Sequence, residues 1–355
     1  MVTTHITARC RDRVVSGRSS PCGAHSSVGF EGNEMGLAPD VKAAQAWCEA
    51  FVAARPSNVT RLAGLLPARK RPLFYPAYCA MRVIDDEVDE GFLGQGDAGR
   101  AASRGAMATR VEAWRSFALD AVAGTYNSGS ASGDDDTIFT AMNASLGTGE
   151  MGPGPWNGLA DAMQRDVEER PLATWGDFLD YTEGAAVAPA SVFVYILACD
   201  VKRDGSSRLS LNRDCADYAR HLAIFSYLVH ILRDLKADAE RAPQHLTLPD
   251  DLLAESGLSK MSLQRAARSS DEAALAPLVG TIAILTERHH EQTIRDLADL
   301  NDETGGDAAM LMGLAEVYSQ QFDAIRADFG RVLEGGGVVD MATVDRLLTS
   351  GSSRS

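Results

Sequence analysis

The sequence predicts an all-α protein with a single main domain. Residues 41–340 are rich in Ala and Leu, and their apolar residues recur at intervals of three and four over long windows. Alternating runs of β-branched residues, which are typical of strands, are few. The pattern does not alternate between strand and helix, and it contains no internal repeat. The main domain is therefore expected to be one bundle of helices.

Helix breakers divide this domain into nine predicted helices. The helices are expected at residues 41–54, 70–89, 105–123, 157–165, 174–199, 214–239, 262–275, 278–300 and 308–333. In chain order, the breakers between them are Pro56, Gly91, Gly94, Pro153, Pro155, Pro171, Pro243, Pro249 and Pro277. Pro277 is expected to separate the seventh helix from the eighth, because proline disrupts a helix interior.

Segments without helical periodicity flank and interrupt the domain. Residues 1–40 are rich in Ser, Gly and Arg, so they are expected to form a flexible leader, either a transit-type peptide or translated sequence before a start at Met35. Residues 124–136, GTYNSGSASGDDD, predict a surface loop. Residues 341–355 are expected to form a C-terminal tail.

Charge and composition exclude several function classes. The 355 residues include 34 Lys and Arg against 49 Asp and Glu, a formal net charge of −15. This charge repels nucleic-acid phosphates, so no nucleic-acid partner is expected, and an anionic substrate would need local help such as a bound cation. No apolar run approaches the roughly 18 residues of a membrane span, so no transmembrane anchor is expected.

The six cysteines indicate a reducing compartment. They form no C-x-x-C pair and have no histidine at metal-site spacing, so neither a disulfide framework nor a zinc site is expected. Several lie in apolar helical stretches, where a free thiol acts as a small apolar residue. A cytoplasmic location is therefore expected, with import into an organelle through the leader as the alternative.

The end of the predicted helix at residues 70–89 is acidic. Asp85 and Asp89 are four residues apart, so a helix places both carboxylates on one face, with Arg82 one turn earlier. Like charges at this spacing repel each other, and a divalent cation would remove that cost. Mg²⁺ suits the position, because it takes oxygen ligands and is often held by one or two carboxylates with substrate phosphates. Three further acids are expected to be solvated: Asp86, Glu87 and Glu90.

The predicted helix at residues 214–239 repeats the arrangement. Asp234 and Asp238 are again four residues apart, and His230 and Tyr227 precede them at one-turn intervals. Two such helices facing each other would line a cavity with four carboxylates at one end, which is a site for a metal-bridged diphosphate. The alternative for each pair is a solvated helix face, but both pairs lie in otherwise apolar helices with an Arg nearby, here Arg233.

The two segments together resemble the squalene/phytoene synthase family of head-to-head prenyl transferases. The family's first motif, R-x-x-D-x-x-x-D, corresponds to Arg82, Asp85 and Asp89, and its second motif corresponds to ILRDLKADAERAPQHLTLP. Between them, ADAMQRDV and DYTEGAAVAPASVF resemble the family's middle segment. The resemblance runs in the right order over about residues 57–333, and paired motifs at this spacing are far more specific than either one alone.

The resemblance implies an isoprenoid-synthase-type helical bundle around a deep apolar pocket. It implies that the four aspartates bind Mg²⁺, or Mn²⁺ in its place, and that farnesyl or geranylgeranyl diphosphate is the substrate. Ionisation would leave an allylic cation and pyrophosphate, with Arg82 and Arg233 stabilising the leaving group. Attack by a second prenyl diphosphate would give a squalene- or phytoene-like product. A peripheral membrane contact for product release is compatible with this chemistry, whereas NADPH use and the oligomeric state are left open.

The resemblance also implies roles for residues outside the metal motifs. Tyr181 and His230 are expected to be catalytic, His230 as a metal ligand or proton acceptor, with a hydrogen-bonded structural role as its alternative. The residues expected to bind substrate are Asn58, Asp166, Ala185, Val187, Ala188 and Tyr227. Tyr227 and His230 stand where the family usually has Gln and Asn, which leaves the reaction outcome open.

Two other functions are alternatives: cyclisation of a single prenyl diphosphate to a terpene, and a catalytically silent relative that acts as a binding or assembly module. The intact acid pairs favour an enzyme, because a binding module has no need of four inward carboxylates. Two apparent motifs are set aside. GQGDAG at residues 94–99 follows an acidic helix, whereas a nucleotide-binding loop of this pattern would follow a strand. Glu287 and His290 form one E-x-x-H pair, whereas a di-iron site needs two.

Overall fold

The computed structural model describes residues 39–201, 207–241 and 245–336, and almost all of its regular structure is helical. The helices are α2 (Pro39–Ala53), α3 (Asn58–Leu62), α4 (Arg71–Asp86), α5 (Asp97–Val122), α6 (Asp134–Leu146), α7 (Gly154–Val167), α8 (Trp175–Thr182), α9 (Ala188–Ala198), α10 (Cys215–Arg241), α11 (Asp250–Glu255), α12 (Lys260–Arg268), α13 (Glu272–Glu303), α14 (Ala309–Ala327) and α15 (Phe329–Arg331). Two-residue strands, β1 (Asp200–Val201) and β2 (Ser207–Arg208), pair antiparallel. The predicted all-α fold is confirmed. The predicted leader, apart from residues 39 and 40 that begin α2, and the predicted tail lie outside the described residues.

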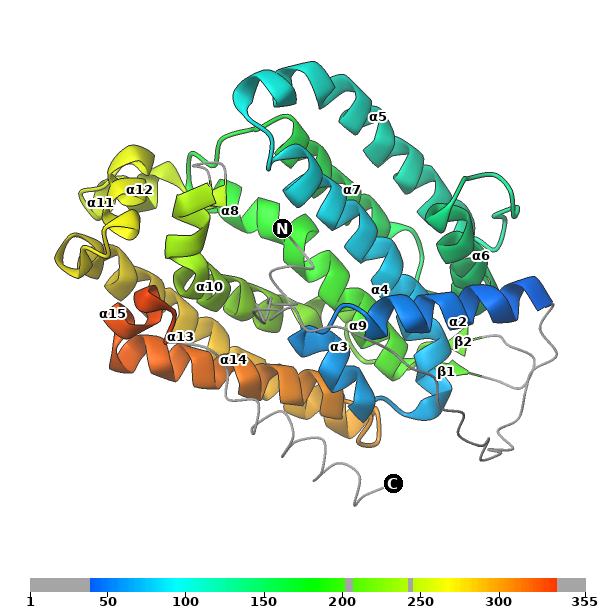
Figure 1. The fold of residues 1–355 in the computed structure, drawn as a ribbon. Coiled ribbons are helices and arrows are strands. Elements are labelled where there is room, and N and C mark those ends of the chain that lie inside the picture. The colour runs from blue at the N-terminus through cyan, green and yellow to red at the C-terminus, as the bar shows by residue number, and fades with distance from the viewer. Residues whose placement is uncertain (1–38, 202–206, 242–244, 337–355) are drawn as a thin grey trace, which may run out of the picture.

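The helices pack around α9, which lies at the centre of the bundle (Figure 1). All residues of α9 from Ala188 to Leu197 are buried, because the helix carries no charged side chain and packs against α4, α7 and α10. The layer formed by α5 and α6 covers α7 and α4 on one side, and α13 and α14 cover α10 on the other. Segments with the longest apolar faces therefore lie inside the bundle, where burial stabilises them most.

One helical stretch among the described residues, Trp175–Ala198, is long and apolar enough to cross a membrane by length and composition. It consists of α8, a π-helical turn η4 (Glu183–Val187) and α9, which follow one another without a break. The prediction of one helix at residues 174–199 is thereby confirmed. Inside the bundle, 78% of the apolar window is buried, so its apolar character is that of a core helix.

Helix α6 was not expected from the sequence. The predicted loop at residues 124–136 ends earlier than expected, and a helix begins at Asp134 directly after Gly133, whose φ is 62°. Three aspartates in the first turn favour a helix start, because they stabilise its positive end. Ile138 and Phe139 begin a buried stripe that packs α6 against α2, α4 and α5. The small and acidic residues at 124–136 are typical of a loop, so the sequence did not indicate that a helix begins among them.

The predicted break at Pro277 is wrong. Helix α13 runs from Glu272 to Glu303 with Pro277 inside it, and the chain turns earlier, at Ser270, whose φ is 51°. The side chain of Asp271 accepts a hydrogen bond from the Ala274 amide and so starts the helix. Because Pro277 is within two turns of this start, it removes one hydrogen bond without ending the helix.

Candidate active site

The first acid pair lies where α4 passes into the π-helical turn η3 (Glu87–Phe92). Asp85 is fully buried and Asp89 is 3% exposed, so both carboxylates point into the bundle. Arg82 is also buried and forms an ion pair with Asp86 at 2.5 Å. Burial opposes the charge of Arg82, but Asp85, Tyr78 and Asp86 outweigh it and raise its pKa, so the guanidinium stays protonated.

The acids around this pair are not all solvated as expected. Asp86 binds Arg82, and Glu87 receives hydrogen bonds from Arg110 of α5 at 2.7 and 3.0 Å, whereas Glu90 is exposed. Asp86 pairs with Arg82 one turn earlier on the same helix, and Glu87 pairs with Arg110 of another helix, so neither is simply solvated.

The second acid pair lies on the last turns of α10. Arg233 donates two hydrogen bonds to Asp234, at 2.8 and 2.7 Å, and Nδ1 of His230 lies 2.9 Å from the same carboxylate. Burial opposes ionisation of Asp234, but Arg233 and His230 outweigh it and hold its pKa well below the usual range. Gln321 of α14 accepts a hydrogen bond from Arg233 at 3.1 Å and fixes the guanidinium from the other side.

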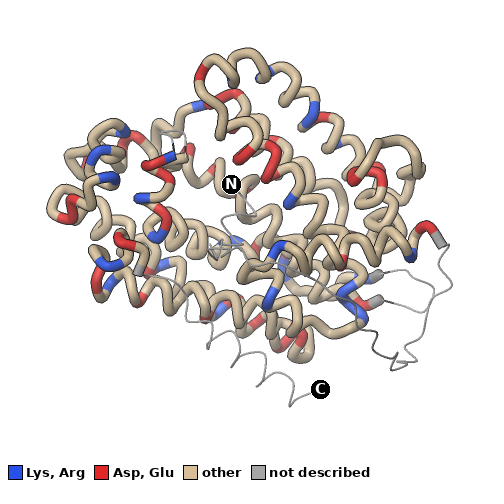
Figure 2. Tube along the Cα trace, in the orientation of Figure 1, with Lys and Arg blue, Asp and Glu red and all other residues tan. Residues whose placement is uncertain are grey.

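The two acid pairs converge. Burial, together with the charges of Asp234 and Asp89, raises the pKa of Asp238 to about 8. Burial also raises the pKa of Asp166 on α7 to about 7, and the charges of Asp89 and Asp85 contribute to that shift. Charges act at this strength only across short, poorly solvated distances. Carboxylates from α4, η3, α7 and α10 therefore share one region, and Figure 2 shows acidic residues where the C-terminal ends of α4 and α10 lie.

A row of hydroxyl groups lies beside these carboxylates. Tyr181 of α8 donates a hydrogen bond to Asp166 at 2.9 Å, and Tyr227 of α10 donates one to Thr247 at 3.1 Å. The rings of Tyr181 and Tyr227 meet edge to face, with centroids 6.3 Å apart. Both rings are buried, so the tyrosines form an apolar wall whose polar tips have partners.

His245 and Thr247 were not identified from the sequence. Nδ1 of His245 lies 3.2 Å from Oδ1 of Asp89, and His245 is 4% exposed. Both residues belong to the segment that follows the second acid pair and returns across the site to the first. In the sequence, HLTLP places a His and a Thr two residues apart soon after the second acid pair. This pattern of polar residues could have identified them as site residues.

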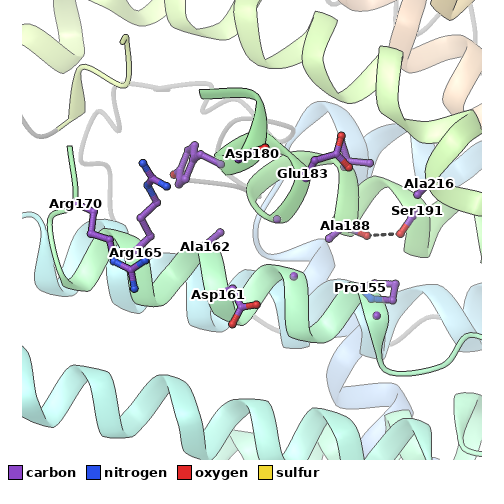
Figure 3. Close-up of a pocket in the computed structure, with 15 residues that line it drawn as sticks. Pro155, Asp161, Ala162, Arg165, Arg170, Asp180, Glu183, Ala188, Ser191 and Ala216 are labelled. Atoms are coloured by element: carbon purple, nitrogen blue, oxygen red, sulfur yellow. Dashed lines mark hydrogen bonds between the residues drawn. The ribbon is translucent and has the colours of Figure 1, made fainter. Parts of the chain in front are cut away.

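The remaining predicted site residues lie in two places. Asn58 starts α3, is 7% exposed, and has a side-chain Nδ2 with no hydrogen-bond partner among the described residues. Ala185 is buried inside η4. Val187 and Ala188 line a cavity of about 510 Å³ between α7 and the α8–η4–α9 segment, with Tyr181 at the same cavity (Figure 3). The structure thus brings Tyr181 to both the carboxylates and the small residues of the middle segment.

Close packing of two glycines sets the distance between α7 and η4. A Cβ on Gly184 would lie 2.3 Å from the carbonyl oxygen of Gly158, so no larger residue fits there without movement. The contact brings Asp166 on α7 close enough to Tyr181 on α8 for their hydrogen bond.

The donor set of the four aspartates fits Mg²⁺, which prefers carboxylate oxygens and retains several waters. Burial, and after it the charges of Asp234 and Asp89, raise the pKa of Asp238, and a bound cation would favour its ionised form. No group of three or more His, Cys, Asp or Glu side chains within the described ranges is arranged to hold one metal ion. Waters and substrate oxygens would therefore have to complete the coordination.

The two motifs set aside from the sequence have structural roles. GQGDAG forms the turn before α5 and its first residues, as expected for a loop. Glu287 on α13 pairs with Arg326 at 2.8 Å, and His290 forms a hydrogen bond with Ser319 at 2.7 Å. Both side chains of the E-x-x-H pattern thus have structural partners on α14.

Comparison with known proteins is consistent with this geometry. A family model described as squalene/phytoene synthase matches residues 57–341. A dehydrosqualene synthase solved in complex with a ligand has a similar fold, with a TM-score of 0.63, 17% identity, and coverage of 89% of this chain and 97% of that chain. Squalene synthase HpnC from Alicyclobacillus acidocaldarius gives a TM-score of 0.58, 19% identity, and coverage of 82% and 97%. YisP from Bacillus subtilis gives a TM-score of 0.52 and 15% identity, and the match covers 87% of this chain and 96% of that chain. No curated protein sequence is detectably similar to the chain.

Proposed function

The chain belongs to the squalene/phytoene synthase family, and on that premise we propose that it is a Mg²⁺-dependent prenyl transferase that condenses two molecules of farnesyl or geranylgeranyl diphosphate head to head. Membership of the family and the fold make it a prenyl transferase of squalene/phytoene synthase type. The metal, the substrate and the residue roles are the proposed part.

The convergence of Asp89 with Asp238 carries the proposal. These residues come from the two acid pairs, and the charge of one raises the pKa of the other. Asp85, Asp89, Asp234 and Asp238 would hold Mg²⁺, or Mn²⁺ in its place. Bound Mg²⁺ supplies positive charge that stabilises a departing diphosphate.

The arginines of the site are placed to assist the same charge change. Arg82 and Arg233 are both held protonated by neighbouring carboxylates, even though burial opposes their charge. Their guanidinium groups would stabilise negative charge on the leaving pyrophosphate. His230 contacts Arg233 and Asp234, and burial together with Arg233 lowers its pKa, which favours the neutral imidazole. In this proposal it would orient Asp234 and accept a proton.

The other wall of the site would protect the carbocation. Tyr181 and Tyr227 present buried rings to the region beside Asp166, and water is excluded from such a wall. The small residues Ala185, Val187 and Ala188 would let a prenyl chain approach the helix backbone. Asn58 would donate a hydrogen bond to the substrate, because its buried side-chain amide has no hydrogen-bond partner among the described residues.

Release of pyrophosphate tests the proposal. Purified protein is incubated with Mg²⁺ and farnesyl or geranylgeranyl diphosphate, and pyrophosphate and extracted hydrocarbons are measured. Asp85→Asn and Asp234→Asn should lower the rate of pyrophosphate release by about a hundredfold or more, because each removes an anionic ligand of the metal. Asp120→Asn is the matched control, since Asp120 is exposed on α5.

The product distinguishes the outcomes. A linear hydrocarbon built from two substrates supports head-to-head condensation, and a cyclised product of one substrate supports a terpene cyclase. No pyrophosphate from any prenyl diphosphate would contradict the enzyme and leave the silent binding module.

A further inference from the structure

A second cavity, of about 150 Å³, lies beside Asp166 and Tyr181 at the C-terminal end of α7. Its walls come from the end of α7 and the segment after it, from Leu246 and Thr247, and from Lys260 of α12. The charged side chains that line it are Arg165, Asp166, Glu169, Arg170 and Lys260. The cavity thus lies outside the four aspartates but borders the same tyrosine wall.

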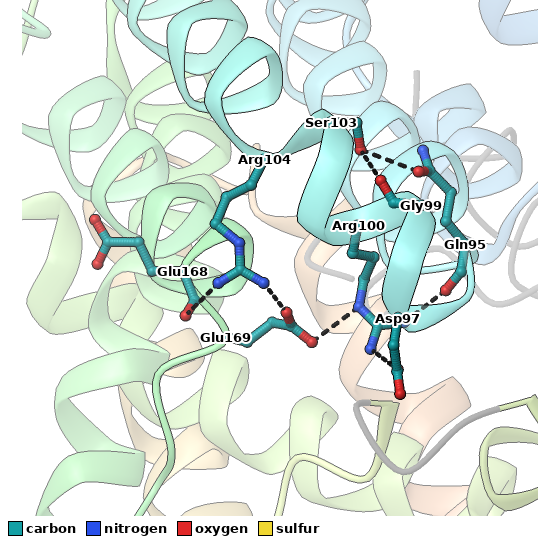
Figure 4. A network of polar contacts seen from close by, with 8 residues as sticks. All are labelled: Gln95, Asp97, Gly99, Arg100, Ser103, Arg104, Glu168 and Glu169. Atoms are coloured by element: carbon teal, nitrogen blue, oxygen red, sulfur yellow. Dashed lines mark hydrogen bonds and ion pairs between the residues drawn. The ribbon is translucent and has the colours of Figure 1, made fainter.

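The carboxylates of this lining are already engaged. Glu169 accepts a hydrogen bond from Arg100 at 2.9 Å and forms an ion pair with Arg104, so two arginines of α5 balance its charge (Figure 4). Asp166 accepts the hydrogen bond of Tyr181. The arginines of α5 thus balance the charge of Glu169, whereas the neutral hydroxyl of Tyr181 does not balance that of Asp166.

Arg165 has unused hydrogen-bonding capacity. Its Nη2 donates to the carbonyl oxygen of Pro171 at 3.0 Å, but its Nε is buried and has no hydrogen-bond partner among the described residues. No described carboxylate forms an ion pair with it. A buried guanidinium N–H without a partner is costly, so a ligand that accepts from it would be stabilised.

Arg170 lies next to Arg165, and both arginines line the larger cavity of about 510 Å³ as well (Figure 3). Arg170 pairs with Glu168, and Nζ of Lys260 lies 3.8 Å from Asp250. Glu168 and Asp250 are both solvent-exposed, with 47% and 54% of their side-chain surface accessible, so water screens their charges more than a buried partner would.

We propose that this cavity binds a diphosphate group at a site separate from the four aspartates. The proposal rests on the proposed function, because prenyl transfer consumes and releases diphosphates. Guanidinium groups match phosphate oxygens with paired N–H donors, and two of them here flank one space. In a chain of net charge −15, such a local group of cations is where an anion would gather.

The volume suits the ligand. A cavity of about 150 Å³ is several times the roughly 30 Å³ that one water occupies in the liquid, so it admits more than a single water or small ion. Two sources share this chemistry: the pyrophosphate that leaves the reaction, and the head group of a prenyl diphosphate whose chain would extend into the larger cavity.

Titration calorimetry with inorganic pyrophosphate tests the site. The whole protein is used in EDTA, so that binding through a divalent cation is absent. Wild type should bind, and Arg165→Gln and Arg170→Gln should each weaken binding by about tenfold or more. Arg326→Gln is the control, because Arg326 is exposed on α14. Because Arg170 is exposed, its variant stays informative if Arg165→Gln fails to fold.

A non-ionisable prenyl thiodiphosphate, titrated in the same way, identifies the source. Tighter binding than pyrophosphate, lost in Arg165→Gln, would assign the site to the substrate head group. Binding of pyrophosphate alone would assign it to the leaving group. No binding of either ligand in EDTA, or binding that the arginine variants do not weaken, would overturn the proposal. This result would leave the proposed function untouched, since turnover with Mg²⁺ is measured separately.

Discussion

His245 reaches Asp89 from the segment that follows the second acid pair, and it thereby links the two halves of the site. Its side chain is buried, so the contact is made away from solvent. A ring nitrogen 3.2 Å from Oδ1 would limit the rotation of the Asp89 carboxylate. The contact should therefore matter for how well Asp89 is oriented toward a metal.

His245→Ala should raise the Mg²⁺ concentration that gives half-maximal pyrophosphate release by about tenfold, because Asp89 loses its fixed orientation. The upward shift of the unfolding temperature by Mg²⁺ should shrink in parallel. His245→Gln, which keeps a hydrogen-bond donor, should restore part of both. Equal Mg²⁺ requirements in wild type and His245→Ala would show that the contact has no orienting role.

Asp166 should make stability depend on pH. Its pKa of about 7 is above the value of about 3.9 in an unfolded chain, so the folded state binds more protons between these values and its stability falls as pH rises through that window. Asp166→Asn removes this loss. The free energy of unfolding of the variant relative to wild type should therefore rise by roughly 2 kcal/mol or more between pH 5 and pH 8. Urea unfolding at both values measures it, and a constant difference would contradict the shift.

The residues of the site were predictable where they share one helix. Asp85 with Asp89, and Asp234 with Asp238, follow from helical spacing alone, and the resemblance to a known family linked the two pairs. Partners contributed by other segments were not predictable. Glu87 was expected to be solvated yet receives hydrogen bonds from Arg110 of α5, and the contact of His245 with Asp89 joins two segments that lie far apart in the sequence.

At the scale of elements, the approach of α7 to η4 depends on two glycines. Gly184→Ala should destabilise the protein by about 1–3 kcal/mol, because its Cβ would overlap the carbonyl of Gly158. Gly280→Ala is the matched control, since its Cβ meets open space on α13 and should be neutral or stabilising by up to about 1 kcal/mol. Chemical denaturation measures both, and equal effects would argue against the close approach.

The ends of helices were predictable where only a helix-breaking residue determines them. They were not predictable where packing against other helices outweighs the local sequence. The continuous segment from α8 to α9 followed from its apolar composition. In α13, the N-terminal hydrogen bond of Asp271 and packing against α10 outweigh Pro277. In α6, a stripe of buried residues after Asp134 outweighs the loop-like composition before it.

At the scale of the whole molecule, the excess of acids and the proposed metal site predict stabilisation by ligands. Mg²⁺ with pyrophosphate should raise the unfolding temperature, because a ligand at about a hundred times its dissociation constant adds about 2.7 kcal/mol. Asp89→Asn and Asp238→Asn should lose most of the shift. Calorimetric scans with Ca²⁺ in place of Mg²⁺ serve as the control for nonspecific charge screening, and equal shifts in wild type and variants would place the cation elsewhere.

The buried helix at the centre of the bundle has a consequence for synthesis. The stretch Trp175–Ala198 precedes α10, which supplies much of its cover, so it is synthesised before its main packing partner. Until α10 packs on it, the stretch is an exposed apolar segment with the hydropathy of a membrane span. Targeting factors or chaperones would meet it in this exposed state. Packing of α10 onto this stretch is therefore expected to be the step that turns it from an exposed apolar segment into the core of the bundle.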